Sequence, residues 1–201
     1  MGNTMTPSAM TVGQINKAVA NYRALLEKHA GEFSPEAVQT ALGQQELAKE
    51  ELEVFRRRVE ANSNLIVCKV RVDRSRTPQE VLDATGRVQH TNQSIVDTMP
   101  KGEGDEVEVM FFKLGRFVKT EELAREYELR GLIPDPYAQA QVNEDDPAFA
   151  DQHFNSCFWD HDGENVSFVS FFRHGGGQRE VRIGRGNHGW GGGWWFAGSR
   201  K

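Results

Sequence analysis

Apolar side chains recur every three to four positions near the start of the chain, which is the spacing of one face of an α-helix. Residues 11–30 carry this pattern and are predicted to form a helix that Gly31 ends. The apolar positions are Val12, Ile15, Val19, Tyr22, Leu25 and Leu26. Residues 1–10 before them are small and polar, and we expect them to be disordered.

A second helix is predicted to begin at Ser34, which is an N-cap residue followed by Pro35 at the first helical position. The apolar spacing then continues to about Asn62, and Gly43 is a point where the helix could be interrupted. The sequence therefore predicts residues 11–62 as a helical hairpin.

The middle of the chain alternates between strand and helix signals. Residues 65–72 and 106–114 are predicted to be strands: the first is an apolar run followed by alternation, and in the second Val107 and Val109 alternate with acids. Short helices are expected at 78–84, which a capping box opens, at 92–99 and at 121–130. We therefore expect a mixed region between the helical hairpin and the end of the chain.

The last third of the chain predicts strands joined by short turns. Residues 134–152 are rich in Pro and Asp, and at most one short helical piece is expected there. Asp162-Gly163 is a two-residue hairpin signal between the first two strands. The predicted strands cover 154–160, 165–172, 180–183 and 190–196. Residues 63–201 are thus expected to form an α+β domain that ends in an antiparallel β-meander.

Composition supports a globular protein. Apolar residues make up 38% of the 201 positions and charged residues 26%, and no apolar run reaches the roughly 20 residues that cross a bilayer. The chain begins without a basic stretch followed by an apolar one, so no secretory signal and no membrane partner are expected. Cys68 and Cys157 lie in separate apolar segments, which favours buried thiols and a cytoplasmic location.

The net charge of −5 conceals a local asymmetry. Residues 171–201 hold six Lys or Arg and one acid, whereas residues 131–172 hold eight acids and no Lys or Arg. Charge pairing between neighbouring segments is the preferred interpretation. The alternative is a basic face offered to an anionic partner.

Glycine and tryptophan are concentrated at the end of the chain. The last thirty residues hold ten of the 20 glycines and three of the four tryptophans. Aromatic residues on strands are most often core. If they are exposed, they form a platform for nucleic-acid bases, sugars or a protein partner. The candidate binding residues are Trp190, Trp194, Trp195, Arg182 and Arg185.

The sequence contains no motif that specifies a catalytic residue, a metal ligand or a cofactor, and none is expected. The glycines at 184, 186 and 189 match the spacing of a dinucleotide loop, but no helix can follow before the chain ends. His153, His161 and Asp160 could supply a metal site, although their spacing matches none of the specific zinc motifs.

Four stretches resemble uncharacterised proteins from uncultivated bacterial and phage-related genomes. They are Arg71-Val-Asp-Arg-Ser-Arg-Thr-Pro-Gln-Glu, Tyr127-Glu-Leu-Arg-Gly-Leu, Asn143-Glu-Asp-Asp-Pro-Ala-Phe-Ala-Asp and Trp194-Trp-Phe-Ala-Gly. The resemblance covers most of the chain and favours a prokaryotic or phage cytoplasmic protein. It implies no activity, cofactor or partner.

The leading hypothesis is a non-enzymatic interaction protein that forms a homo-oligomer through its N-terminal helices. A second hypothesis is nucleic-acid binding by the basic, Trp-rich C-terminal segment, against which the overall acidity counts. A third is a metal-dependent hydrolase that uses His153, His161 and Asp160.

Overall fold

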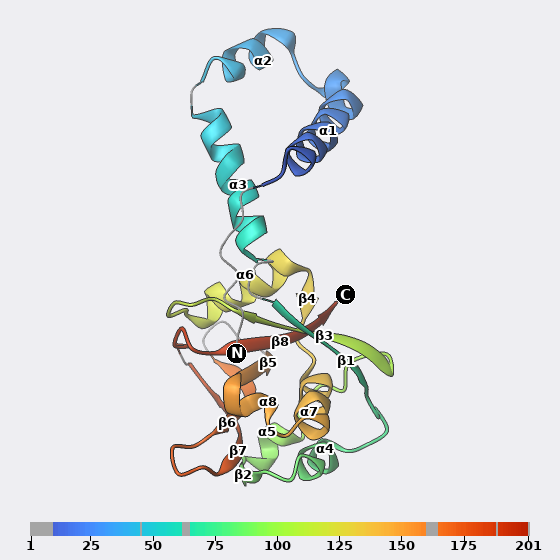
Figure 1. The fold of residues 1–201 in the computed structure, drawn as a ribbon, viewed down its shortest axis with the longest axis vertical. Helices are drawn as coiled ribbons and strands as arrows, with labels where there is room; N and C mark the ends of the chain where they lie inside the picture. Colours follow the sequence, from blue (N-terminus) through green and yellow to red (C-terminus); the bar gives the residue numbers. More distant parts are fainter. Residues whose placement is uncertain (1–9, 45, 62–64, 160–164, 188, 201) are drawn as a thin grey trace. The chain divides into compact units, whose positions relative to one another are not determined.

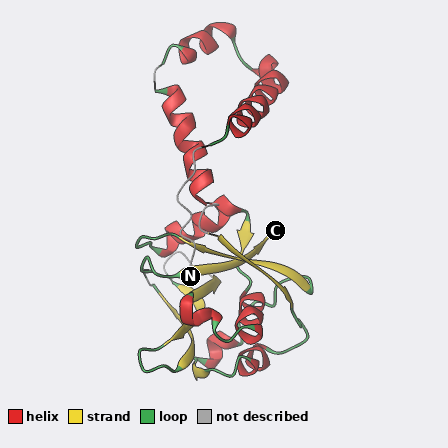
Figure 2. Cartoon of the chain, in the orientation of Figure 1, coloured by secondary structure: helices red, strands yellow, loops and turns green. Residues whose placement is uncertain are grey.

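The computed structural model describes most of the chain (Figure 1). The described residues are 10–44, 46–61, 65–159, 165–187 and 189–200. The chain divides into two compact units, Met1–Val54 and Phe55–Lys201. Figure 2 shows that the described part of the first unit is helical, whereas the strands belong to the second.

The first unit consists of α1 (Val12–His29), a short 3-10 turn η1 (Ala30–Glu32), α2 (Pro35–Leu42) and the beginning of α3 (Leu47–Ala61). Thr11 forms a capping box with Gln14 at the start of α1, and Ser34 caps α2 with Pro35 at its first position. The predicted interruption at Gly43 is confirmed, since α2 ends there and α3 follows as a separate helix.

The second unit has an α+β fold, as predicted. Its strands are β1 (Leu65–Arg71), β2 (Val88–His90), β3 (Glu106–Lys113), β4 (Leu132–Ile133), β5 (Asn155–Trp159), β6 (Val166–Arg173), β7 (Arg179–Gly186) and β8 (Trp195–Arg200). Its helices are α4 (Pro78–Ala84), α5 (Gln93–Val96), α6 (Thr120–Arg130), α7 (Pro136–Asp145) and α8 (Phe149–Gln152). The described strands form one mixed sheet in the order β1-β3-β8-β5-β6-β7-β2, and β4 pairs with β8.

The predicted antiparallel meander is correct for β5, β6 and β7 and wrong for the last strand. β8 does not pair with β7; it lies between β3 and β5, antiparallel to the former and parallel to the latter. Phe196 and Ala197 are both buried, on opposite faces of β8. A strand that is apolar on both faces is best covered in the middle of a sheet, which explains this position.

Helices cover both faces of the sheet. α6 packs on one face, where Leu123 and Tyr127 join a core that includes Phe112, Phe158 and Phe196. Figure 1 shows α4, α5, α7 and α8 on the other side of the sheet, and their buried side chains belong to a second core. The sheet is therefore the middle layer of three.

The Pro- and Asp-rich segment 134–152 is more helical than predicted. It forms α7 and α8, and Asp135 caps α7 by accepting a hydrogen bond from the Ala138 amide at 3.0 Å. Seven of the ten residues of α7 are buried. A helix that is buried almost all round has no polar stripe, so the periodicity that reveals surface helices is missing.

None of the described helices combines the length and apolar character that a membrane span requires.

Candidate functional site

The C-terminal tryptophans and arginines are divided between the two faces of the sheet. Trp194 comes directly before β8 and Trp195 is the first residue of that strand, and the two side chains lie on opposite faces of the sheet. Trp194 packs with the core under α6, whereas Trp195 packs with the opposite core. Arg182 and Arg185 are three positions apart on β7 and are separated in the same way.

Three of the five predicted binding residues line one pocket on the α6 face of the sheet. The pocket has a volume of about 520 Å³, within the range of roughly 300–1,000 Å³ that is typical of small-molecule sites. We call it the aromatic pocket. Its lining residues are Phe154, Phe168, Ser170, Phe172, Arg173, His174, Arg182, Gly189, Trp190 and Trp194.

Trp190 anchors the aromatic pocket to the core. Its side chain is 4% exposed, and its ring meets those of Phe168 and Phe196 edge-on at centroid distances of 5.6 and 5.7 Å. Trp194 packs against it at 5.9 Å and remains partly exposed. The prediction that aromatic residues are mostly core is therefore confirmed for Trp190, while Trp194 belongs to the pocket wall.

The glycines around the tryptophans allow two backbone segments to approach closely. A Cβ atom on Gly192 would lie 2.7 Å from the carbonyl carbon of Gly115. Beside it, the amide and carbonyl of Trp190 pair with those of Val118 at 2.9 and 3.0 Å. The glycine-rich segment is thus held against residues 115–118, and Gly192 is the position where a side chain would prevent this close approach.

Two arginines give the aromatic pocket a positive edge. Arg173 donates through Nε to the carbonyl of Gly177 at 3.0 Å and lies 3.5 Å from the Asp151 carboxylate. Arg179 binds the same carboxylate more closely, at 2.8 Å. Asp151 therefore compensates two basic residues, which agrees with the preferred charge-pairing interpretation at this position. The guanidinium of Arg182 lies over the ring of Phe172, 5.7 Å from its centroid.

Trp195 and Arg185 lie away from the aromatic pocket. The Trp195 ring meets His153 edge-on at 5.2 Å, with the Lys113 ammonium 5.9 Å from its centroid. Arg185 donates to the Ser167 hydroxyl at 2.9 Å. Trp195 and Arg185 therefore do not share a face with Trp190 and Trp194, and a binding role for them stays a prediction.

The hypothetical metal site cannot be assembled from the described residues. Asp160 and His161 lie outside them, and His153 packs between the rings of Phe149 and Trp195. Burial, followed by the nearby Lys113, lowers the pKa of His153. The described part of the chain contains no group of three or more His, Cys, Asp or Glu side chains that could hold a metal ion.

The two cysteines are free thiols without the features of a nucleophile. Cys157 is completely buried, and burial raises its pKa well above the ordinary value. Burial also raises the pKa of Cys68. A thiolate is the reactive form of cysteine, and burial disfavours that form at both positions.

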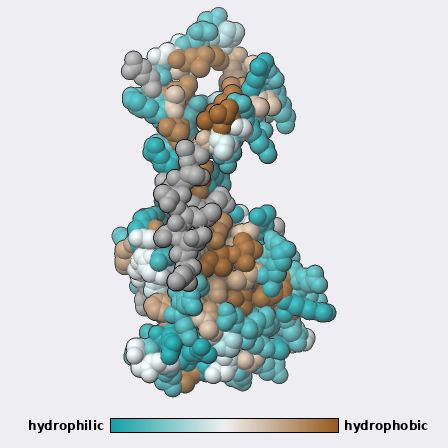
Figure 3. All heavy atoms as spheres, in the orientation of Figure 1, coloured by the Kyte–Doolittle hydropathy of each residue, from teal (hydrophilic) through white to brown (hydrophobic). Residues whose placement is uncertain are grey.

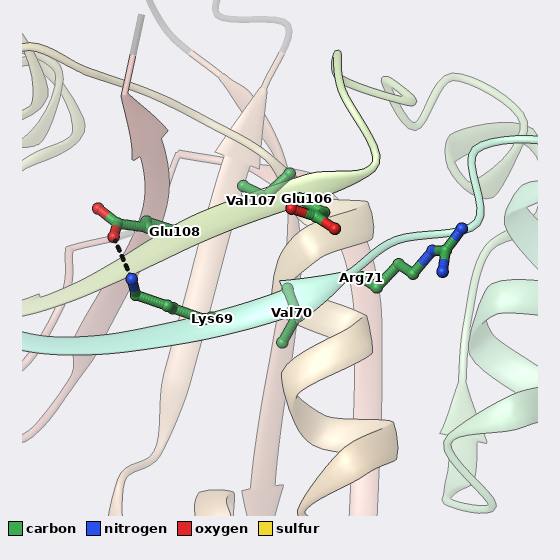
Figure 4. Close-up of a pocket in the computed structure, with 6 residues that line it drawn as sticks. All are labelled: Lys69, Val70, Arg71, Glu106, Val107 and Glu108. Carbon is green, nitrogen blue, oxygen red and sulfur yellow. Dashed lines mark ion pairs between the residues drawn. The ribbon is translucent and has the colours of Figure 1, made fainter.

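Two other pockets are less suited to binding. Figure 4 shows one of about 390 Å³ on β1 and β3, where Lys69 and Glu108 form an ion pair of 3.1 Å across the strands. Its polar side chains spread along the two strands and do not converge. The other pocket contains Arg74 and Arg76, whose charges are compensated by Asp135 and Glu144 at 2.7 and 2.8 Å.

The sequence-based prediction named three of the ten residues that line the aromatic pocket. Phe168, Ser170 and Phe172 alternate along β6 and therefore share a face, and Ser170 pairs with Arg182 across β6 and β7. The alternation was visible in the sequence. The strand register, which brings Arg182 to Phe172, was not.

Searches against protein-family models, curated proteins and solved structures each found no match.

Proposed function

We propose that this protein is a non-enzymatic interaction protein that self-associates through its N-terminal helices, with a second copy of the same chain as the partner. The observation that carries the proposal is the exposure of the apolar face of α1. No residue of α1 or α2 is buried. The exposed side chains include Val12 at 73%, Ile15 at 46%, Val19 at 62%, Tyr22 at 48% and Leu26 at 48%.

The spacing of these residues suits a helix partner. They follow one another at intervals of three and four, as do the a and d positions of helices that pack side by side. Burying an apolar side chain contributes about 1.5–3 kcal/mol, so half-burying five of them contributes on the order of 5 kcal/mol. An isolated helix of this length is only marginally stable in water, so packing of its apolar face against a partner would stabilise α1.

The charges of the first unit favour a second copy of the chain as the partner that buries the apolar face of α1. α1 carries three Lys or Arg and one Glu, whereas residues 46–54 carry four Glu and one Lys. Oppositely charged helix surfaces attract, and α1 of one copy can face the acidic segment of another. Within one chain the Tyr22 hydroxyl donates to Glu51, yet Tyr22 and Leu52 remain about half exposed. Figure 3 shows apolar residues gathered along these helices.

The test is the mass of the full chain in solution, measured by sedimentation over a wide range of concentrations. We expect a concentration-dependent oligomer, and Val19→Glu with Leu26→Glu should weaken it at least tenfold by placing charges in the apolar face. Ala24→Glu adds the same charge on the opposite side of α1 and should leave it unchanged. A full chain that is monomeric throughout would refute the proposal.

The cytoplasmic location is part of this proposal and remains a prediction from the two free cysteines.

A further inference from the structure

The aromatic pocket is a second surface suited to binding, and all of its lining residues belong to the second unit. Its lining combines five aromatic side chains with Arg173, Arg182 and His174, and it contains no carboxylate among the described residues. A lining of this kind suits a ligand with a flat apolar part and a negative charge.

Arg182 is the group best placed to bind that negative charge. It is exposed and forms no ion pair with any residue that the structure describes, whereas Arg173 and Arg179 share Asp151. Its contact with the Phe172 ring holds the guanidinium at the pocket wall. A guanidinium offers paired donors that match the oxygen atoms of a phosphate.

The flat part of a ligand can use the aromatic wall. Phe154 is 41% exposed, and Trp194 stays partly exposed although its ring contacts those of Phe154 and Phe172 at 6.3 and 6.4 Å. These neighbours meet Trp194 at angles of 60° and 77°, so none of them stacks flat on it. Bases stack on such rings because every base has a π-face.

We propose that the aromatic pocket binds a nucleotide, with the base against Trp194 and the phosphate on Arg182. The pocket volume of about 520 Å³ is sufficient for one such ligand. The chain as a whole carries a net charge of −5, which opposes the tracking of a long phosphate backbone. We therefore expect a single nucleotide or the end of a strand to be bound, and not an extended nucleic acid.

Fluorescence titration and calorimetry at low salt test the proposal on the full chain. The probes are adenosine monophosphate, adenosine, inorganic phosphate and a short single-stranded oligoadenylate. We expect the monophosphate to bind at least roughly tenfold more tightly than adenosine or phosphate, since each of these fills half of the site. Tighter binding of the oligoadenylate than of the monophosphate would indicate that the ligand is the end of a strand. Equal or weaker binding of the oligoadenylate would indicate that the ligand is a free nucleotide.

Variants separate the two halves of the pocket. Arg182→Ala should abolish the preference for the monophosphate over adenosine, whereas Trp194→Ala should weaken both ligands roughly tenfold. Arg185→Ala is the matched control, because Arg185 lies on the same strand and the opposite face, and it should bind like the wild type. If Trp194→Ala does not fold, Trp194→Leu retains apolar volume and removes the stacking surface.

Either of two results would overturn the proposal. One is the absence of monophosphate binding at millimolar concentration and low salt. The other is an Arg182→Ala variant that, while folded, binds the monophosphate as tightly as the Arg185→Ala control.

Discussion

The buried ion pair between Arg74 and Asp135 provides a sharp test of how the second unit is held together. Both guanidinium Nη atoms donate to the carboxylate at 2.7 Å, and the side chains of Arg74 and Asp135 are only 13% and 1% exposed. The same carboxylate caps α7 by accepting from the Ala138 amide. One side chain therefore supports both an ion pair and a helix start.

We predict that Asp135→Ala lowers the free energy of unfolding by about 4 kcal/mol. Removing one partner from a buried pair costs about 3–5 kcal/mol. The lower value applies here because Arg74 keeps the carbonyls of Gly104 and Glu103 as acceptors, at 3.0 and 3.3 Å. Loss of the helix cap adds about 1 kcal/mol. Domains typically have a total stability of about 5–15 kcal/mol, so this loss would remove roughly a quarter or more of it.

Denaturant unfolding followed by tryptophan fluorescence measures this change, because all four tryptophans lie in the second unit. Asp135→Asn should lose less stability than Asp135→Ala, since its amide oxygen can still cap α7. Asp145→Ala is the matched control: Asp145 is exposed at the other end of α7, and its loss should change stability by less than about 0.5 kcal/mol. If Asp135→Ala is as stable as this control, the pair does not support the fold.

Gly192→Ala should destabilise the second unit by about 1–3 kcal/mol, since its Cβ would lie 2.7 Å from the backbone of Gly115. Gly193→Ala should not destabilise it, because a Cβ atom there would have nothing within 4 Å. Equal unfolding midpoints for the two variants would contradict the packing role of Gly192. A hydrogen bond from Arg179 holds the pKa of Asp151 below its ordinary value of 3.8. A carboxyl group whose pKa is lowered by folding stabilises the fold at pH values above its unfolded-state pKa, and this contribution is lost as the pH falls through the folded-state pKa. Asp151→Asn should therefore be less stable than the wild type at neutral pH and approach the stability of the wild type in acid. A stability difference that does not change with pH would refute the ion-pair role.

Local sequence signals predicted most of the helices and strands. The predicted helix ends agree with the structure at three places. α2 begins at Ser34 with Pro35, α4 begins at the capping box of Thr77, and α6 ends at Gly131, which has a left-handed conformation. The signals are reliable because they act between residues that are close in the chain. The α7 helix was underestimated because it is buried, and burial removes the polar stripe on which the periodicity depends.

The sequence also contained the ingredients of the candidate site without their arrangement. It determined that aromatic residues, glycines and arginines are concentrated near the end of the chain. Only the tertiary structure placed β8 between β3 and β5 and fixed the register of β6 with β7. Strand pairing joins residues that are far apart in the chain, and a shift of one residue exchanges the two faces. That is why Trp194 and Arg182 line the aromatic pocket, while Trp195 and Arg185, which have the same side chains, belong to the other side of the sheet.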